Sequence, residues 1–116
     1  MLTLDGKETK LAKDFMYALA EEFHLNSKDC GFWDEGIESR NKGKMVALMH
    51  RGLSDALEAI RNPCQDPRCP KFSSEVIEFA NAIIRILDYC VAFDLPIADA
   101  IIAKHEFNIN RRILGE

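Results

Sequence analysis

The chain has 116 residues, of which 47% are hydrophobic and 29% charged, a composition typical of one globular domain and not of a disordered chain. The net charge of −4 excludes a general attraction to nucleic acid or to an anionic membrane. No apolar run is long enough to span a bilayer, and the first ten residues lack the apolar core of a signal peptide. We therefore expect a single domain, residues 1–116, in the cytoplasm, with its four cysteines as free thiols.

The N-terminal part of the chain predicts one helix and a long loop. After a loose lead-in at residues 1–7, a helix is predicted over about 10–27, because apolar side chains recur every four residues. They are Leu11, Phe15, Leu19 and Phe23. The following segment, about 28–43, has the glycines and charges of a loop.

Three further helices are predicted. The second covers about 44–61, with an apolar stripe along one side, and Pro63 ends it. The third begins at Ser73 or Ser74 and is about 20 residues long. The fourth has Asp94 as its N-cap and Pro96 in its first turn, and runs towards Arg112. Because no segment alternates like a strand, the chain is predicted to be an all-α bundle of four helices.

The third predicted helix is apolar around more than half of its circumference. The isoleucines that widen its apolar surface are Ile77, Ile83, Ile84 and Ile86. An oligomer interface would explain this broad apolar surface, and so would a central position of the helix within one chain. The large apolar fraction of so short a chain favours the oligomer.

Acidic side chains on two helices form a first candidate site. Asp55 and Glu58 share a face of the second helix, and Glu75 and Glu78 share a face of the third, because residues three apart are neighbours on a helix. Brought together, the two faces could hold a divalent cation such as Mg²⁺, which prefers oxygen ligands. The alternative is that these carboxylates are solvated surface acids.

Two further groups could bind a nucleotide. Lys104, Asn108 and Arg111 lie on one stripe of the last helix, where they could contact phosphate or simply complement the helix dipole. Trp33, grouped with His24, could stack on a nucleobase or anchor its loop to the core. The sequence contains neither a nucleophile–base pair nor a glycine-rich phosphate loop.

Four segments, in the right order, resemble MazG-like proteins of the all-α nucleoside triphosphate pyrophosphohydrolase superfamily. His24 followed by CGFWDE is similar to the end of the family's first helix and the loop after it. VALMHRGLSDALEAIR and VIEFANAIIRILDYC resemble its two metal-binding helices. DLPIADAIIAKHEFNINRR resembles its last helix, so the resemblance extends over nearly the whole chain.

The resemblance implies a four-helix MazG-like bundle whose core is shared between the subunits of a homodimer or homotetramer. It also implies an enzyme that uses Mg²⁺, or Mn²⁺, to hydrolyse a nucleoside triphosphate to the monophosphate and pyrophosphate. The residues that match the metal site are Asp55, Glu78 and Asn81, with Glu58 as a helper, and Asp55 and Glu78 would be catalytic. The residues implied in nucleotide binding are Trp33, Lys104, Asn108 and Arg111.

The chain departs from the family where the metal would bind. The family has Glu-x-x-Glu on one helix and Glu-x-x-Asp on the next. Here Gly52 replaces the first Glu, Asp55 the second, and Asn81 the final Asp, while Glu78 is retained. An amide oxygen can be a ligand but brings no charge. The alternatives are an enzyme of reduced or altered activity, an inactive nucleotide-binding homologue, and a helical oligomeric interaction protein.

Overall fold

The prediction of an all-α chain with four helices is confirmed. The computed structural model describes residues 2–113 and 115, although not the side chain of Ile113. Its four α-helices are α1 (Gly6–Asp29), α2 (Lys42–Arg61), α3 (Ser74–Ala92) and α4 (Ile97–Ile113), with a short 3₁₀-helix, η1, at Ile37–Ser39. The described residues form no strand beyond an isolated bridge between Gln65 and Ser73. They also include no helix long and apolar enough to cross a membrane.

The first helix begins earlier than predicted. The Asp5 carboxylate accepts a hydrogen bond from the Glu8 amide at 2.7 Å, and the Glu8 carboxylate accepts one from the Asp5 amide at 3.1 Å. This reciprocal capping box starts α1 at Gly6, so the expectation of a loose lead-in over residues 1–7 was wrong for its last residues. At the other end, Gly31 adopts a φ of 87°, and the Phe32 amide donates to the carbonyl of Ser27.

The prediction that Asp94 caps the last helix was wrong. Asp94 has a φ of 54° and ends α3 instead. The amide after it, on Leu95, donates to the Cys90 carbonyl at 2.8 Å, which is the bond of a left-handed helix terminus. Aspartate tolerates this conformation better than most side chains. As a result Pro96 lies before α4 and not in its first turn, and α4 starts at Ile97.

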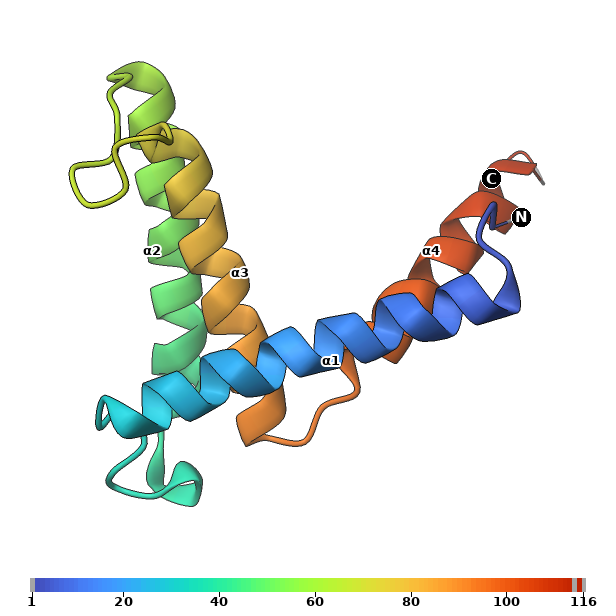
Figure 1. The fold of residues 1–116 in the computed structure, drawn as a ribbon, viewed down its shortest axis with the longest axis horizontal. Helices are drawn as coiled ribbons and strands as arrows, with labels where there is room; N and C mark the ends of the chain where they lie inside the picture. Colours follow the sequence, from blue (N-terminus) through green and yellow to red (C-terminus); the bar gives the residue numbers. More distant parts are fainter. Residues whose placement is uncertain (1, 114, 116) are drawn as a thin grey trace.

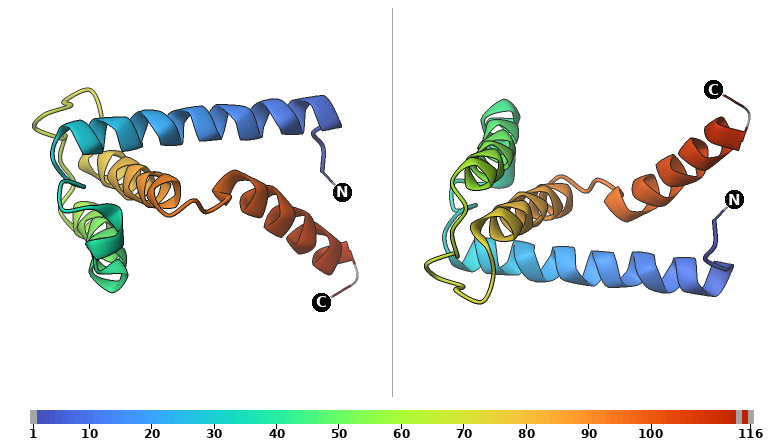
Figure 2. Two further views of the ribbon diagram at one scale, coloured as in Figure 1. Left: turned by 90° about the horizontal axis from the view of Figure 1, so that it is seen from below. Right: turned by 90° about the horizontal axis from the view of Figure 1, so that it is seen from above.

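The helices form an open arrangement. Helices α2 and α3 pack side by side as an antiparallel hairpin, and α1 crosses the hairpin near the C-terminal half of α3 (Figure 1). Helix α4 packs on α1 and points away from the hairpin (Figures 1 and 2). The radius of gyration, 16.7 Å, exceeds the value of about 13 Å expected for a compact domain of this length.

Small side chains bring α2 and α3 together. Gly52, Ala56 and Ala59 are buried on α2, and Ala82 is buried on α3. A Cβ placed on Gly52 would lie 3.4 Å from the Ala82 Cβ, so the two helices cross with Gly52 facing Ala82. This contact fixes which sides of the hairpin the flanking residues face.

Replacing Gly52 with alanine tests this spacing. The new methyl group would make van der Waals contact with Ala82, and a mid-helix glycine is less favourable than alanine. We expect Gly52→Ala to raise the free energy of unfolding by about 0.5–1 kcal/mol in urea denaturation. Gly52→Leu should lower it, whereas Ala47→Leu on the exposed side of α2 should change it little. Destabilisation by Gly52→Ala would contradict the spacing.

Helix α4 is held to α1 by a polar contact at its first turn. The Tyr17 hydroxyl donates to Asp99 Oδ2 at 2.6 Å, and Lys13 Nζ donates to Asp99 Oδ1 at 2.9 Å. The hydrogen bonds from Tyr17 and then Lys13 lower the pKa of the Asp99 carboxyl group, and the same contact raises the pKa of Tyr17 and of Lys13.

The lowered pKa of Asp99 predicts acid-sensitive docking of α4. Its contribution should be fully present above the ordinary carboxyl pKa, about 4, and lost as the pH falls through the lowered pKa. Hydrogen exchange of the α4 amides, corrected for intrinsic rates, should therefore be slower in the wild type than in Asp99→Asn above that pH. The difference between the two proteins should disappear as the pH falls. The control is Asp14→Asn, because Asp14 pairs with Lys10 inside α1. Equal acid sensitivity in wild type and Asp99→Asn would contradict this role.

Much of the predicted apolar surface is not buried within the chain. Leu53 follows Gly52 and Ile83 follows Ala82, and on antiparallel helices both positions turn to the same side of the hairpin. Leu53 is 49% exposed and Ile83 is 55% exposed. We call this side the hairpin apolar face. Its exposed residues are Val46, Leu53, Leu57, Ile60, Val76, Phe79 and Ile83.

Candidate functional site

The polar side of the hairpin lies opposite its apolar face. Asn81 precedes Ala82 and Asp55 lies three residues after Gly52, and both positions turn away from Leu53 and Ile83. With Gly52 level with Ala82 and a rise of about 1.5 Å per residue, Asp55 and Glu78 reach nearly the same height on facing helices. The register agrees with a contact further along, where Arg85 Nη1 donates to the Leu48 carbonyl at 2.9 Å.

Within one chain, the donors near this point do not form a metal site of the family's four-carboxylate type. In the described part of the chain no three His, Cys, Asp or Glu side chains are grouped so that they could hold a metal ion. Asp55 and Asn81 are exposed and Glu78 is half-buried. The helper suggested by the sequence, Glu58, instead accepts a hydrogen bond from Asn62 Nδ2 at 2.5 Å. Two carboxylates and an amide are fewer charged ligands than a cation site of the family type provides.

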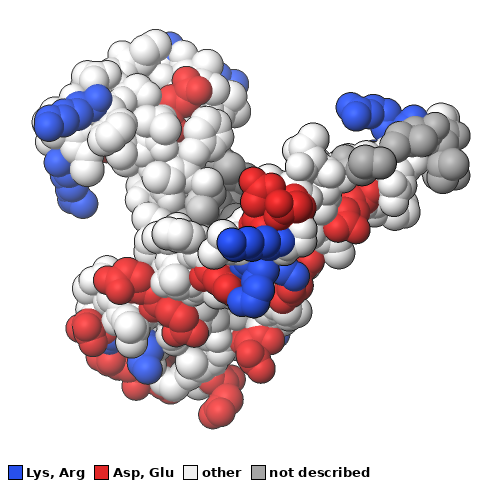
Figure 3. Space-filling view, turned by 45° about the vertical axis from the view of Figure 1, so that its right-hand side comes forward, with Lys and Arg blue, Asp and Glu red and all other residues white. Residues whose placement is uncertain are grey.

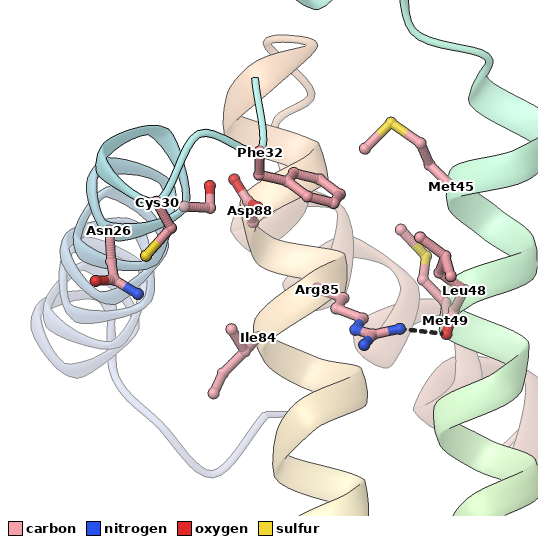
Figure 4. A pocket seen from close by; sticks show the side chains of 10 residues that line it. Asn26, Cys30, Phe32, Met45, Leu48, Met49, Ile84, Arg85 and Asp88 are labelled. Atoms are coloured by element: carbon pink, nitrogen blue, oxygen red, sulfur yellow. Dashed lines mark hydrogen bonds between the residues drawn. The ribbon is translucent and has the colours of Figure 1, made fainter. Parts of the chain in front are cut away.

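A cavity of about 310 Å³ lies beside this polar side, between the end of α1, the first half of α2, and α3 (Figure 4). Its walls are mostly apolar, and Figure 4 shows the Phe32 ring, Met45 and Met49 on one side of it. Arg85 and Asp88, one turn apart on α3, are its charged residues. Its size is at the small end of the range for ligand sites, so it suits one ring system rather than a whole nucleotide.

Asp88 joins this cavity to a buried hydrogen-bond network. His24 Nδ1 and Asp88 Oδ1 are hydrogen-bonded at 2.7 Å, and the Trp33 indole N–H donates to the same oxygen at 3.2 Å. Trp33 also donates to the Ser27 hydroxyl at 2.9 Å. His24 and Asp88 are each 7% exposed, and Trp33 is 5% exposed. The network fixes the loop after α1 against α3.

Trp33 is therefore an anchor of its loop in this chain, the second of the two roles considered for it. Its ring packs edge-on against Phe32 and Phe93 and its indole N–H is occupied. Phe32 is the more exposed aromatic of the pair and lines the cavity. Stacking of Trp33 on a nucleobase stays a prediction.

The residues predicted to bind phosphate on the last helix lie apart from the hairpin. Lys104, Asn108 and Arg111 are exposed on α4, and the Lys104 ammonium group lies 4.5 Å from the centre of the Phe107 ring. Helix α4 extends to the opposite side of the molecule from the α2–α3 hairpin (Figure 1). Within one chain, they do not share a site with Asp55 and Glu78.

Arg85 and Asp88 were not singled out as site residues from the sequence. The available signal was the polar stripe of α3, Glu78, Asn81, Arg85 and Asp88, with spacings of three, four and three. That pattern is also what a solvated helix face has, so only the cavity and the buried contact to His24 distinguish Asp88. Comparisons with known protein families, with curated proteins and with solved structures found no match.

Proposed function

We propose that this protein binds a nucleotide along the polar side of the α2–α3 hairpin, as a MazG-like protein with an incomplete metal site. The observation that carries the proposal is the polar stripe of α3, which runs from Glu78 and Asn81 to the cavity at Asp88. Asn81 and Asp88 are separated by about 10 Å along the helix, comparable to the distance from a nucleobase to its phosphate. The base would enter the cavity, and the phosphates would lie by Arg85 and Asn81.

The pyrophosphohydrolase reaction of the resembled family is the second candidate. It is favoured by the nearly equal height of Asp55 and Glu78 on the two helices. Those two carboxylates are retained from the family's four, and they would be the residues that bind Mg²⁺ or Mn²⁺. The Gly52 and Asn81 replacements reduce the negative charge available to hold the metal. Nucleotide binding is therefore our first candidate function and hydrolysis the second.

Binding should be measured by calorimetry with a panel of nucleoside triphosphates, with and without Mg²⁺. At least one should bind, and Arg85→Ala should weaken binding about tenfold, because a charge-assisted contact to phosphate is lost. Arg61→Ala is the matched control, an exposed arginine at the far end of α2. Failure of every nucleotide to bind would leave the helical interaction protein as the remaining reading.

We also propose that the functional unit is a homo-oligomer, because its site is incomplete in one chain. The hairpin points away from α4, so Lys104, Asn108 and Arg111 could reach a nucleotide at the hairpin only from a second copy. The chain exposes 8550 Å², about 2,100 Å² more than expected for a compact monomer of this length. An excess of that size matches the area that obligate dimers bury.

The side of the hairpin seen in Figure 3 has the composition expected of a surface that a partner covers. Its atoms are largely uncharged, whereas acidic and basic side chains gather in the lower part of the view, around α1. An apolar surface of this extent is more than a soluble monomer normally leaves in water. A second copy packed on the hairpin apolar face would remove it from water and leave the opposite, polar side open.

A further inference from the structure

We infer that the cavity at Asp88 selects guanine, an inference that rests on the proposed nucleotide site and names the base it takes. The polar residues that line the cavity are Asn26, Ser27, Arg85 and Asp88, of which Asp88 is the one carboxylate, and the remaining walls are mostly apolar. A flat ring held between such walls is oriented by the hydrogen-bonding groups among them. Which base fits is therefore decided by whether the free oxygen of Asp88 accepts or donates a hydrogen bond, and by the direction in which it points.

Asp88 presents one oxygen to the cavity. Oδ1 is occupied by His24 and Trp33. Oδ2 receives no hydrogen bond from the described residues, and in that part of the chain no fully buried polar side-chain atom lacks a partner. Since Asp88 lines the cavity, Oδ2 is the atom that a ligand can reach. The contacts to His24 and Trp33 hold the carboxylate so that it cannot turn away.

A carboxylate beside an imidazole and an indole N–H is an acceptor, so it favours a ring edge that carries donors. Guanine presents its N1–H and its exocyclic amino group next to one another, and the two lone pairs of Oδ2 can accept both. Hypoxanthine keeps only the N1–H, and adenine offers only an amino group. Uracil places carbonyl oxygens on both sides of its N–H, where they would repel the carboxylate. The expected order of binding is guanine, then hypoxanthine and adenine, then uracil.

Arg85 stands where the sugar and phosphate of such a ligand would leave the cavity. Its guanidinium group donates to the Leu48 carbonyl at 2.9 Å and lines the same cavity (Figure 4). The Phe32 ring also lines the cavity and is 36% exposed although Arg40 lies over it at 4.5 Å, which leaves part of the ring free for contact with a base. The cavity is therefore lined by both a donor for phosphate, Arg85, and an acceptor for the base, Asp88.

The test is a titration of the full-length protein with GMP, IMP, AMP and UMP in the absence of divalent metal, by calorimetry. The fluorescence of Trp33, the single tryptophan, serves as a second readout because its indole N–H donates to Asp88. GMP should bind about tenfold or more tightly than IMP, because one hydrogen bond to a charged group is lost. Equal binding of the four, or tighter binding of UMP than GMP, would overturn the inference.

Two variants locate the effect. Asp88→Asn should remove the preference for GMP, because an amide no longer offers a charged acceptor. If that variant does not fold, Ile84→Phe decides, since it narrows the cavity without touching the Asp88 network and should abolish GMP binding. Glu22→Gln, exposed on α1, is the control. Unchanged GMP binding by Ile84→Phe would place the base elsewhere.

The outcomes separate this inference from the proposed function. GMP selectivity without turnover of any triphosphate leaves the inference standing and removes only the hydrolytic candidate. Triphosphate binding that depends on Arg85 but is equal for all bases retains the nucleotide site and rejects the guanine assignment. Failure of both GMP and the triphosphates to bind rejects both.

Discussion

Replacing His24 with leucine should lower the free energy of unfolding by about 3 kcal/mol. The reason is that Asp88, 7% exposed, would lose its shortest hydrogen bond and keep only the 3.2 Å contact from Trp33. A buried carboxylate left with fewer donors costs more than the hydrogen bond itself contributed. Urea denaturation followed by circular dichroism measures the effect.

The control for His24→Leu is His105→Leu, since His105 is exposed on α4 and should change stability by less than about 0.5 kcal/mol. A double variant, His24→Leu with Asp88→Leu, should be more stable than the sum of the single changes predicts, because no charge is then left buried. A His24→Leu effect as small as that of the control would show that the network does not hold the loop after α1.

Introducing charge on the hairpin apolar face should separate the proposed oligomer into single chains. Leu53→Glu with Ile83→Glu places two carboxylates where a partner would bury apolar side chains, and burying them unpaired is strongly unfavourable. Sedimentation velocity should show the wild type as a dimer or larger species and the double variant as a monomer.

Ala47→Glu is the matched control for the oligomer, because Ala47 is exposed on α2 but lies outside the hairpin apolar face. It should sediment like the wild type. A wild-type protein that sediments as a monomer at the concentrations of the binding measurements would contradict the oligomer. It would also mean that Lys104, Asn108 and Arg111 take no part in a site on the hairpin.

The sequence was sufficient to predict four α-helices, with their approximate centres, and no strand among the residues that the structure describes. Hydrophobic period and capping residues carry that information locally. The boundaries failed where a short-range side-chain bond or an unusual φ decided them. The Asp5–Glu8 capping box lengthened α1, and the positive φ of Asp94 ended α3 rather than starting α4.

The buried side of α2 could not be predicted from its apolar stripe. Gly52, Ala56 and Ala59 are the buried small residues of α2, Gly52 facing Ala82 of α3, and such residues contribute little to a hydrophobic pattern. The larger residues of the stripe, among them Leu53 and Ile60, remain exposed in the chain. An interpretation of the hydrophobic pattern that considers one chain alone therefore assigns these large apolar residues to the core, although they lie on the surface of the chain.

The candidate site was predictable only in part. Asp55, Glu78 and Asn81 were selected from a motif, and the antiparallel register of α2 and α3 gives Asp55 and Glu78 similar heights. The role of Asp88 was not predictable, because its partner His24 is 64 residues away in the sequence. A contact between residues so far apart in the sequence produces no local sequence pattern from which it could be predicted.

The most direct test of the central claim, that the hairpin carries a nucleotide site with an incomplete metal-binding part, is pyrophosphate release by an Asn81→Asp variant. Asn81 is exposed, so this change restores one missing carboxylate without disturbing the helix contact, whereas a Glu at Gly52 would extend beyond the room that Ala82 leaves for a Cβ. With Mg²⁺ and a triphosphate panel led by GTP, the variant should release pyrophosphate at least about a hundredfold faster than the wild type. A folded variant that neither binds nor hydrolyses any triphosphate would contradict the account.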